Sequence, residues 1–193
     1  MTDLLALITL MLWPVVPLFW IPVHFATIFF KKVGLLSYIM PLITWLPLAY
    51  IIYKNRVFLL QYKIELPVVL NIFGMLFLTL GTMLHIWTAR LLGILGIIGV
   101  PEISTKIKEN LMTEGPFSIV RHPTYLAHTL IFSGVFLITE VTSVGIITLL
   151  DFIIINTIII PLEEKELLSR FGEDYEFYKR KVPSRFFPRV HMR

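Results

Sequence analysis

Two polar segments and the two apolar runs between them decide the fold of this chain. Residues 111–125 read Leu-Met-Thr-Glu-Gly-Pro-Phe-Ser-Ile-Val-Arg-His-Pro-Thr-Tyr, and residues 161–175 read Pro-Leu-Glu-Glu-Lys-Glu-Leu-Leu-Ser-Arg-Phe-Gly-Glu-Asp-Tyr. The runs between them, 126–139 and 144–160, are almost free of charge and just long enough to enter a bilayer and return. A helical hairpin built from these runs would bring the Arg121 segment and the Glu163 segment to the same membrane face.

The rest of the chain extends this apolar pattern. Hydrophobic residues make up 56% of the sequence, against ~45–50% in an average soluble domain. Further apolar runs cover 4–30, 35–53 and 67–89, each of a length that suits a spanning helix. Strands with period-two alternation are missing from the pattern, and backbone groups in lipid must be satisfied internally. The sequence therefore predicts one all-α domain over 1–193, a polytopic membrane helical bundle of about five transmembrane helices.

Local signals refine the boundaries of these helices. Residues 54–66 read as a polar loop, and the short apolar run 91–100 either extends the third helix or lies at the membrane interface. Gly74 and Gly81 permit close contact with a neighbouring helix. Pro123 suits the first position of the fourth helix, residues 139–143 form the hairpin tip, and the fifth span ends at Pro161. From 162 onwards an amphipathic helix, weakened by Gly172, precedes an extended tail over 182–188.

The distribution of lysine and arginine predicts the orientation. Positive charges collect in the first and third loops and in the C-terminal tail, whereas the hairpin tip has none. Under the positive-inside rule the N-terminus lies outside, and the C-terminus, with the amphipathic helix and the polar segments, faces the cytosol. Loop 54–66 carries Lys54, Arg56 and Lys63 and opposes this assignment. The first apolar run lacks a basic region before it, which favours a retained span over a cleaved signal peptide.

Several classes of chemistry are excluded by composition. The chain has no cysteine, so disulfides, thiolate catalysis and thiolate metal ligation are impossible. The five histidines show no metal-binding pattern; His122 and His128, six residues apart, should point to different sides of a helix, and His24, His85 and His191 are isolated. A net charge of +4 without a basic, aromatic patch gives no indication of nucleic-acid binding. The glycine-rich loop of soluble methyltransferases is also missing.

The two polar segments allow both a structural and a functional interpretation. Arg121 and Tyr125 fit interfacial anchoring, but a helix beginning at Pro123 beside an arginine would also bind a carboxylate or a polar cofactor. Glu163 and Glu164 fit the first turn of a helix, and they could equally bind a cationic ligand. Polar residues within an apolar span usually face the bundle interior. Asn156, about two turns before Glu163, is therefore a candidate for the pocket lining, and Asp151 lies in the same span.

The motifs T-x-G-P-F-x-x-V-R-H-P-x-Y and E-E-x-x-L-x-x-x-F-G-x-x-Y-x-x-Y-x-x-x-V-P are both present between residues 113 and 183. Their combination resembles the isoprenylcysteine carboxyl methyltransferases and the related phospholipid N-methyltransferases, and the resemblance covers about 103–188. It implies S-adenosyl-L-methionine as cofactor and S-adenosyl-L-homocysteine as product. The positions that match the cofactor site of these families, together with Asn156 from the argument above, are Asn110, Leu111, Met112, Phe117, His122, Pro123, Tyr125, Asn156 and Glu163.

The resemblance also implies a lipophilic methyl acceptor that enters from the bilayer. The first expectation is carboxyl methylation of a prenylcysteine, whose ionised carboxylate requires no general base. Where eukaryotic prenylcysteine enzymes carry an acceptor-binding arginine, this chain has Ile159, so Arg121 is the nearest candidate cation and Arg189 the next. The alternatives are N-methylation of a phospholipid or other lipid amine with Glu164 as base, a sterol-type membrane reductase, and a scaffold without enzymatic activity.

Overall fold

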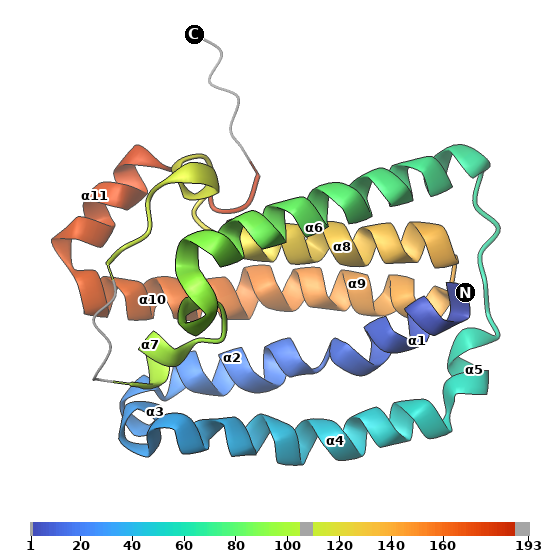
Figure 1. Cartoon of the computed structure of the whole chain (residues 1–193), viewed down its shortest axis with the longest axis horizontal. Helices are drawn as coiled ribbons and strands as arrows, with labels where there is room; N and C mark the ends of the chain where they lie inside the picture. Colours follow the sequence, from blue (N-terminus) through green and yellow to red (C-terminus); the bar gives the residue numbers. More distant parts are fainter. Residues whose placement is uncertain (1, 105–109, 188–193) are drawn as a thin grey trace, which may run out of the picture.

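The computed structural model describes residues 2–104 and 110–187, and its helices lie side by side in one bundle (Figure 1). The first apolar run forms α1 (Thr2–Leu12), α2 (Val15–Phe25) and α3 (Thr27–Val33). The break before Val15 follows from the prolines, because Pro17 cannot donate a hydrogen bond to the carbonyl of Trp13 four residues earlier. A short 3₁₀ turn, η1 (Gly34–Tyr38), leads into α4 (Ile39–Lys54).

The polar stretch after α4 is not wholly a loop, because it contains the helix α5 (Arg56–Leu60). The chain then enters α6 (Val68–Ile97), so the apolar run 91–100 extends the third helix. At Gly93 (φ 68°, ψ 171°) the backbone of α6 leaves the helical region, which bends its last turn. The short helix α7 (Val100–Ile103) follows. Lys106 and Lys108, which belong to the predicted third loop, lie outside the described residues.

The predicted hairpin is present as α8 (Pro123–Thr139) and α9 (Thr142–Ile154), joined at residues 140–141. Pro123 is the first residue of α8, as its missing N–H predicts. The helix that contains the last predicted span does not end at Pro161. α9 continues through a π-helical turn, η3 (Ile155–Ile159), into α10 (Ile160–Phe171). Pro161 follows directly on this turn, where the Ile160 N–H bonds to the Ile155 carbonyl and the regular α-helical hydrogen-bond pattern is interrupted.

The predicted amphipathic helix after 162 is also two elements rather than one. Gly172 adopts φ 55°, a conformation that favours glycine, and it separates α10 from α11 (Glu173–Lys181). α11 folds back over one end of the bundle (Figure 1). Residues 182–187 are extended or bent, as predicted for the tail, while Pro188, Arg189 and His191 lie outside the described residues.

The helices α6 and α8 pack closely against each other in the bundle. A side chain at Gly81 would lie 2.8 Å from the Ala127 carbonyl, and one at Gly134 would lie 2.6 Å from the Leu78 amide. The predicted close approach at Gly74 is also confirmed, because a Cβ there would lie 3.1 Å from the Gly134 carbonyl. Small residues allow this approach, which supplies van der Waals contact where lipid removes the hydrophobic driving force.

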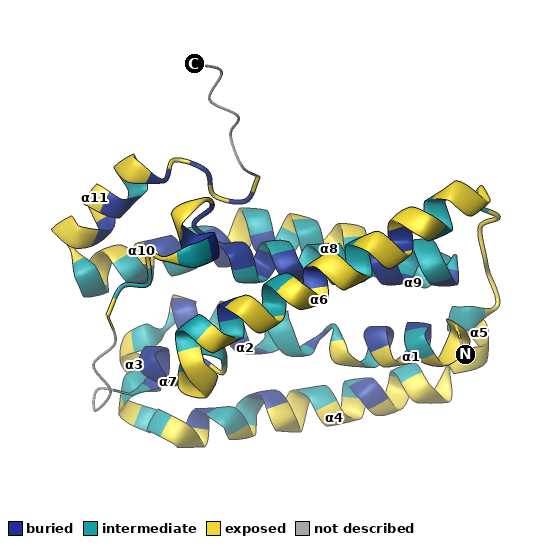
Figure 2. Cartoon of the chain, turned by 45° about the horizontal axis from the view of Figure 1, so that its top comes forward, coloured by how far each residue is buried: buried dark blue, intermediate teal, exposed yellow. Residues whose placement is uncertain are grey.

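The outer surface is consistent with a membrane environment. Four helical segments are long and apolar enough to cross a bilayer, namely Thr2–Phe25, Thr27–Lys54, Val68–Ile103 and Thr142–Phe171, and α8 is a shorter apolar helix of 17 residues. The outward faces of α4 and α6 are largely exposed (Figure 2), and their exposed side chains are mostly apolar. The chain is thus an integral membrane protein with an all-α helical bundle.

Candidate functional site

The two polar segments meet at one end of the bundle, as the hairpin predicts. The 3₁₀ turn η2 (Gly115–Ser118) leads to Arg121 and His122, whose backbone amides donate to the carbonyls of Ser184 and Arg185 at 2.9 and 3.0 Å. The C-terminal tail therefore pairs with the start of α8 in an extended arrangement. This pairing brings the Arg121–His122 segment and the C-terminal tail together next to α10.

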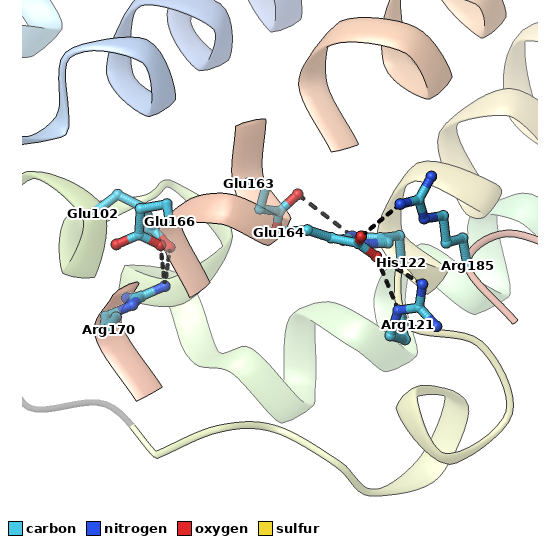
Figure 3. Close-up of polar contacts among 8 residues, drawn as sticks. All are labelled: Glu102, Arg121, His122, Glu163, Glu164, Glu166, Arg170 and Arg185. Atoms are coloured by element: carbon cyan, nitrogen blue, oxygen red, sulfur yellow. Dashed lines mark hydrogen bonds and ion pairs between the residues drawn. The ribbon is translucent and has the colours of Figure 1, made fainter. Parts of the chain in front are cut away.

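Glu164 is the centre of a buried charge network (Figure 3). Its Oε1 accepts hydrogen bonds from Nε and Nη2 of Arg121 at 2.9 and 2.8 Å, and its Oε2 accepts one from Arg185 at 2.9 Å. His122 Nε2 lies 3.3 Å from the same Oε1. The remaining Arg121 nitrogen, Nη1, donates to the Val182 carbonyl at 2.6 Å. A carboxylate with two guanidinium partners is held in its charged form and is a poor proton acceptor.

Glu163 stands on the other side of the same histidine. Its Oε2 lies 3.5 Å from His122 Nδ1, and the His122 ring stacks on Tyr125 with centroids 5.9 Å apart. Burial alone lowers the pKa of His122, but the carboxylates of Glu163 and Glu164 together outweigh it, so the pKa lies above its ordinary value. His122 thus bridges two glutamates that differ in surroundings, because Glu163, unlike Glu164, also lines a cavity.

That cavity, of about 250 Å³, lies between α6, α8 and α10 and is closed at one side by α11. Eight of the residues that the sequence singled out line it: Asn110, Leu111, Met112, Phe117, Arg121, His122, Tyr125 and Glu163. They come from the segment before α8, from the start of α8 and from α10. The hairpin thus assembles them although they are up to 53 positions apart in the sequence.

Four predicted site residues lie outside the cavity lining. Glu164 faces the arginine network instead, and Pro123 is buried at the start of α8. Ile159 is fully buried in an apolar cluster with Tyr125, Ile155, Ile160 and Phe186. The Asn156 side chain donates to the Phe152 carbonyl at 2.8 Å. The π turn over 155–159 adds a residue to its turn and rotates Asn156 by about 100° from the face that α-helical spacing predicts.

Several lining residues were not anticipated. His85 and His128 face the cavity, and the expectation that His122 and His128 point to different sides does not hold. His122 is the N-cap of α8 with non-helical backbone angles (φ −122°, ψ 60°), so helical periodicity does not set its direction. Tyr175 also lines the cavity, and its buried hydroxyl has no hydrogen-bond partner among the described residues. Burial raises the pKa of Tyr175 well above its ordinary range, so the hydroxyl stays a donor.

A second charged group borders the cavity (Figure 3). Arg170 on α10 lies 3.1 Å from Glu102 on α7 and 3.1 Å from Glu166, and Lys31 on α3 lies 3.7 Å from Glu166. Glu102 and Arg170 belong to the cavity lining. These contacts tie α3, α7 and α10 together, so both lining arginines, Arg121 and Arg170, are bound to carboxylates of the chain.

Sequence comparison decides the family of this protein. The model of the phospholipid methyltransferase family matches residues 69–174, which span α6, α8, α9 and α10. The chain belongs to the phospholipid methyltransferase family. Methyltransferases of this family typically use S-adenosylmethionine. The matched region contains most of the cavity lining, whereas α1–α4 lie outside it.

Curated relatives carry names from metal resistance. The chain is 33% identical over 117 residues to the cobalt-zinc-cadmium resistance protein CzcN of Cupriavidus metallidurans, covering 55% of this chain and 53% of that protein. It is 31% identical over 119 residues to the nickel-cobalt-cadmium resistance protein NccN of Alcaligenes xylosoxydans xylosoxydans, covering 62% and 50%. The chain spans about half the length of these relatives. No solved structure matches, and the described residues contain no cluster that could hold a metal ion.

Proposed function

We propose that the protein transfers a methyl group from S-adenosylmethionine to an acceptor in a membrane lipid. The observation that carries this proposal is the cavity in which Glu163 and His122 face apolar walls from α2 and α6. A carboxylate beside a half-enclosed apolar space suits a ligand that is cationic at one point and apolar elsewhere. The sulfonium and ammonium groups of the cofactor meet this description.

The residues present fit this cofactor. Glu163 would pair with a cationic or hydroxyl group, and the Tyr175 hydroxyl, which has no partner among the described residues, would donate to an acceptor atom. Residues 110–112 and Phe117 would enclose the remaining surface. When bound, S-adenosylmethionine supplies an electrophilic methyl on sulfur. The task of the chain is to hold the acceptor in line with that methyl and to exclude water, effects that can supply up to ~7–11 kcal/mol of the barrier reduction.

An adjoining apolar cavity gives room for the acceptor's hydrocarbon tail. It has a volume of about 420 Å³ between α2, α4 and the end of α6. Val16, Trp20 and Ile97 line both cavities, so the two spaces share a wall. The other lining residues are Val15, Phe19, Tyr38, Pro41, Leu42, Trp45 and Ile98. An acyl or prenyl chain in this apolar cavity would place the head group of the acceptor next to the cavity that Glu163 and His122 line.

The polar contacts favour a lipid amine over a prenylcysteine carboxylate as acceptor. A carboxylate would need a cation, and Arg121 and Arg170 already bind carboxylates of the chain. Ile159, at the position of the arginine in prenylcysteine enzymes, is enclosed by apolar side chains. Glu164 is an unsuitable base for an amine because its oxygens accept from Arg121 and Arg185. Methylation of an amine therefore requires a proton acceptor other than Glu164.

Calorimetry of the solubilised protein tests the proposed cofactor. We expect S-adenosylhomocysteine to bind with micromolar or stronger affinity and NADPH not to bind. Glu163→Gln should weaken this binding about 10- to 100-fold, as expected when a charge-assisted contact of ~1.5–3 kcal/mol is lost. Asn156→Ala, outside the cavity lining, is the matched control and should bind like the wild type. Binding of NADPH alone would instead support a sterol-type reductase.

A further inference from the structure

The deep end of the cavity holds a second polar group that the cofactor site does not use. His128 on α8 and His85 on α6 both line the cavity there. His128 is six residues beyond His122, which places it about 9 Å deeper along the axis of α8. The side chain of His128 is 20% exposed.

Behind His128 lies a buried acid. Asp151 on α9 is 2% exposed, and its Oδ2 lies 3.2 Å from His128 Nε2, at ion-pair distance but without hydrogen-bond alignment. Its other oxygen, Oδ1, accepts a hydrogen bond from the Trp13 indole at 3.0 Å. A carboxylate within an apolar span is costly, and such residues are usually kept for a function. Here the indole fixes one oxygen and leaves the other directed to His128.

This arrangement gives His128 the properties of a general base. A carboxylate next to Nε2 favours the tautomer with its proton on Nε2, which leaves Nδ1 as an acceptor. Nε2 has no aligned hydrogen bond to another group among the described residues, so Asp151 Oδ2 at 3.2 Å is the charged atom placed next to it. The Phe132 ring packs on the imidazole at a centroid distance of 4.2 Å and restricts its orientation. The titratable groups that face His128 are Asp151 and His85.

From this geometry we propose that His128, positioned by Asp151, is the catalytic base that removes a proton from an amine acceptor. The inference rests on the proposed methyl transfer and deepens it by assigning the base that a primary ammonium acceptor requires. That ammonium gives a proton to His128 Nδ1, and the freed nitrogen lone pair forms the new C–N bond. The S–CH₃ bond of the cofactor breaks with its electron pair on sulfur, which leaves a neutral thioether and a secondary ammonium. His128 returns its proton to solvent when the products leave.

The chemistry of the acceptor explains why such a base is needed. A primary alkyl ammonium resembles the lysine side chain, with a pKa near ~10.4, so it has no free lone pair at neutral pH. A prenylcysteine carboxylate is ionised already and would gain nothing from His128. The His128–Asp151 pair is therefore expected for an acceptor that enters as a proton donor and not for a carboxylate.

The test uses the full chain in vesicles that contain phosphatidylethanolamine, with transfer of labelled methyl as the readout. His128→Ala should lower kcat on this lipid by about 10²–10⁴-fold, the usual contribution of a general base. Its affinity for S-adenosylhomocysteine should stay within threefold of the wild type. Added imidazole should restore part of the activity of His128→Ala. His24→Ala, a buried histidine stacked on Trp20 outside the cavity lining, is the matched control and should gain nothing from imidazole.

Asp151→Asn gives a second readout that a structural role would not change. It should lower kcat on the aminolipid and leave KM and the affinity for S-adenosylhomocysteine within threefold of the wild type, because an amide no longer selects the tautomer of His128 that is protonated on Nε2. The proposal is overturned if His128→Ala retains kcat within threefold. It is also overturned if a preparation that binds S-adenosylhomocysteine methylates a prenylcysteine carboxylate but not the aminolipid between pH 6 and 10. Failure of the wild type to bind S-adenosylhomocysteine would contradict the proposed function itself.

Discussion

Glu164 and Arg121 form a buried ion pair in which Nη2 and Oε1 are 2.8 Å apart and both side chains are 6% exposed. The pair joins α10 to the segment before α8, and Arg185 of the tail completes it from the second carboxylate oxygen. Glu163, the next residue, turns to the cavity. Two adjacent glutamates thus have separate roles, because one of them holds the chain together and the other is available to a ligand.

The first prediction concerns this division of roles. Glu164→Gln should lower the free energy of unfolding by about 3–5 kcal/mol, because it leaves a buried guanidinium without its carboxylate. Arg185→Ala should cost no more than about 1 kcal/mol, since its side chain is 52% exposed. Reversible denaturation in mild detergent measures both. A Glu164→Gln protein as stable as the wild type would contradict the structural role of the network.

The second prediction concerns the contribution of His122 to the free energy of unfolding, which should depend on pH. The carboxylates of Glu163 and Glu164 overcome the effect of burial and raise the pKa of His122 in the folded protein. The folded state therefore holds its proton more tightly than the unfolded chain. This contribution is complete below the unfolded pKa of about 6.5 and is lost as pH rises through the higher folded pKa.

The stability difference between wild type and His122→Gln should consequently be largest near pH 6 and shrink as the pH rises. Unfolding measured at intervals from pH 6 to 9 checks this trend. A difference that grows with pH would mean that burial dominates and that His122 is neutral in the folded protein.

A third prediction concerns Ile159. If this position faced a carboxylate acceptor, Ile159→Arg would raise activity on carboxylates. Ile159 is instead fully buried among apolar side chains, so the new guanidinium would be buried without a partner. We expect Ile159→Arg to destabilise the protein by several kcal/mol, whereas Ile159→Leu costs less than about 1.5 kcal/mol. A folded Ile159→Arg protein with higher activity on carboxylates would instead show that this position faces the acceptor.

The orientation in the membrane remains a prediction that labelling can test. Residues 60–65, the α8–α9 turn and the start of α1 lie at one end of the bundle, and α11 lies at the other (Figure 1). Since the chain has no cysteine, single cysteines can be introduced at the exposed positions Glu65 and Lys181. An impermeant reagent applied outside should modify Glu65→Cys and leave Lys181→Cys unmodified. The reverse pattern would place the cavity on the extracytoplasmic side.

The sequence alone determined the elements of this protein and their rough order. The long apolar runs required helices, because backbone groups in lipid must be paired within the segment. Pro123 marked the start of α8, and the apolar runs 126–139 and 144–160, which are almost free of charge, implied that Arg121 and Glu164 would meet. Gly74 and Gly81 indicated where α6 and α8 approach closely. These conclusions depend on local rules of length, proline position and side-chain size, which a sequence states directly.

The tertiary structure decided which polar residues share a space. The π-helical segment 155–159 directs Asn156 away from the cavity, and the residue types in that run do not predict a π helix. The N-cap conformation of His122 let it share the cavity with His128, against the helical spacing. Asp151, His128 and Trp13 met only because α8 and α9 pack together with the turn between α1 and α2. Contacts between distant segments depend on the packing of the whole bundle, so periodicity within one helix cannot predict them.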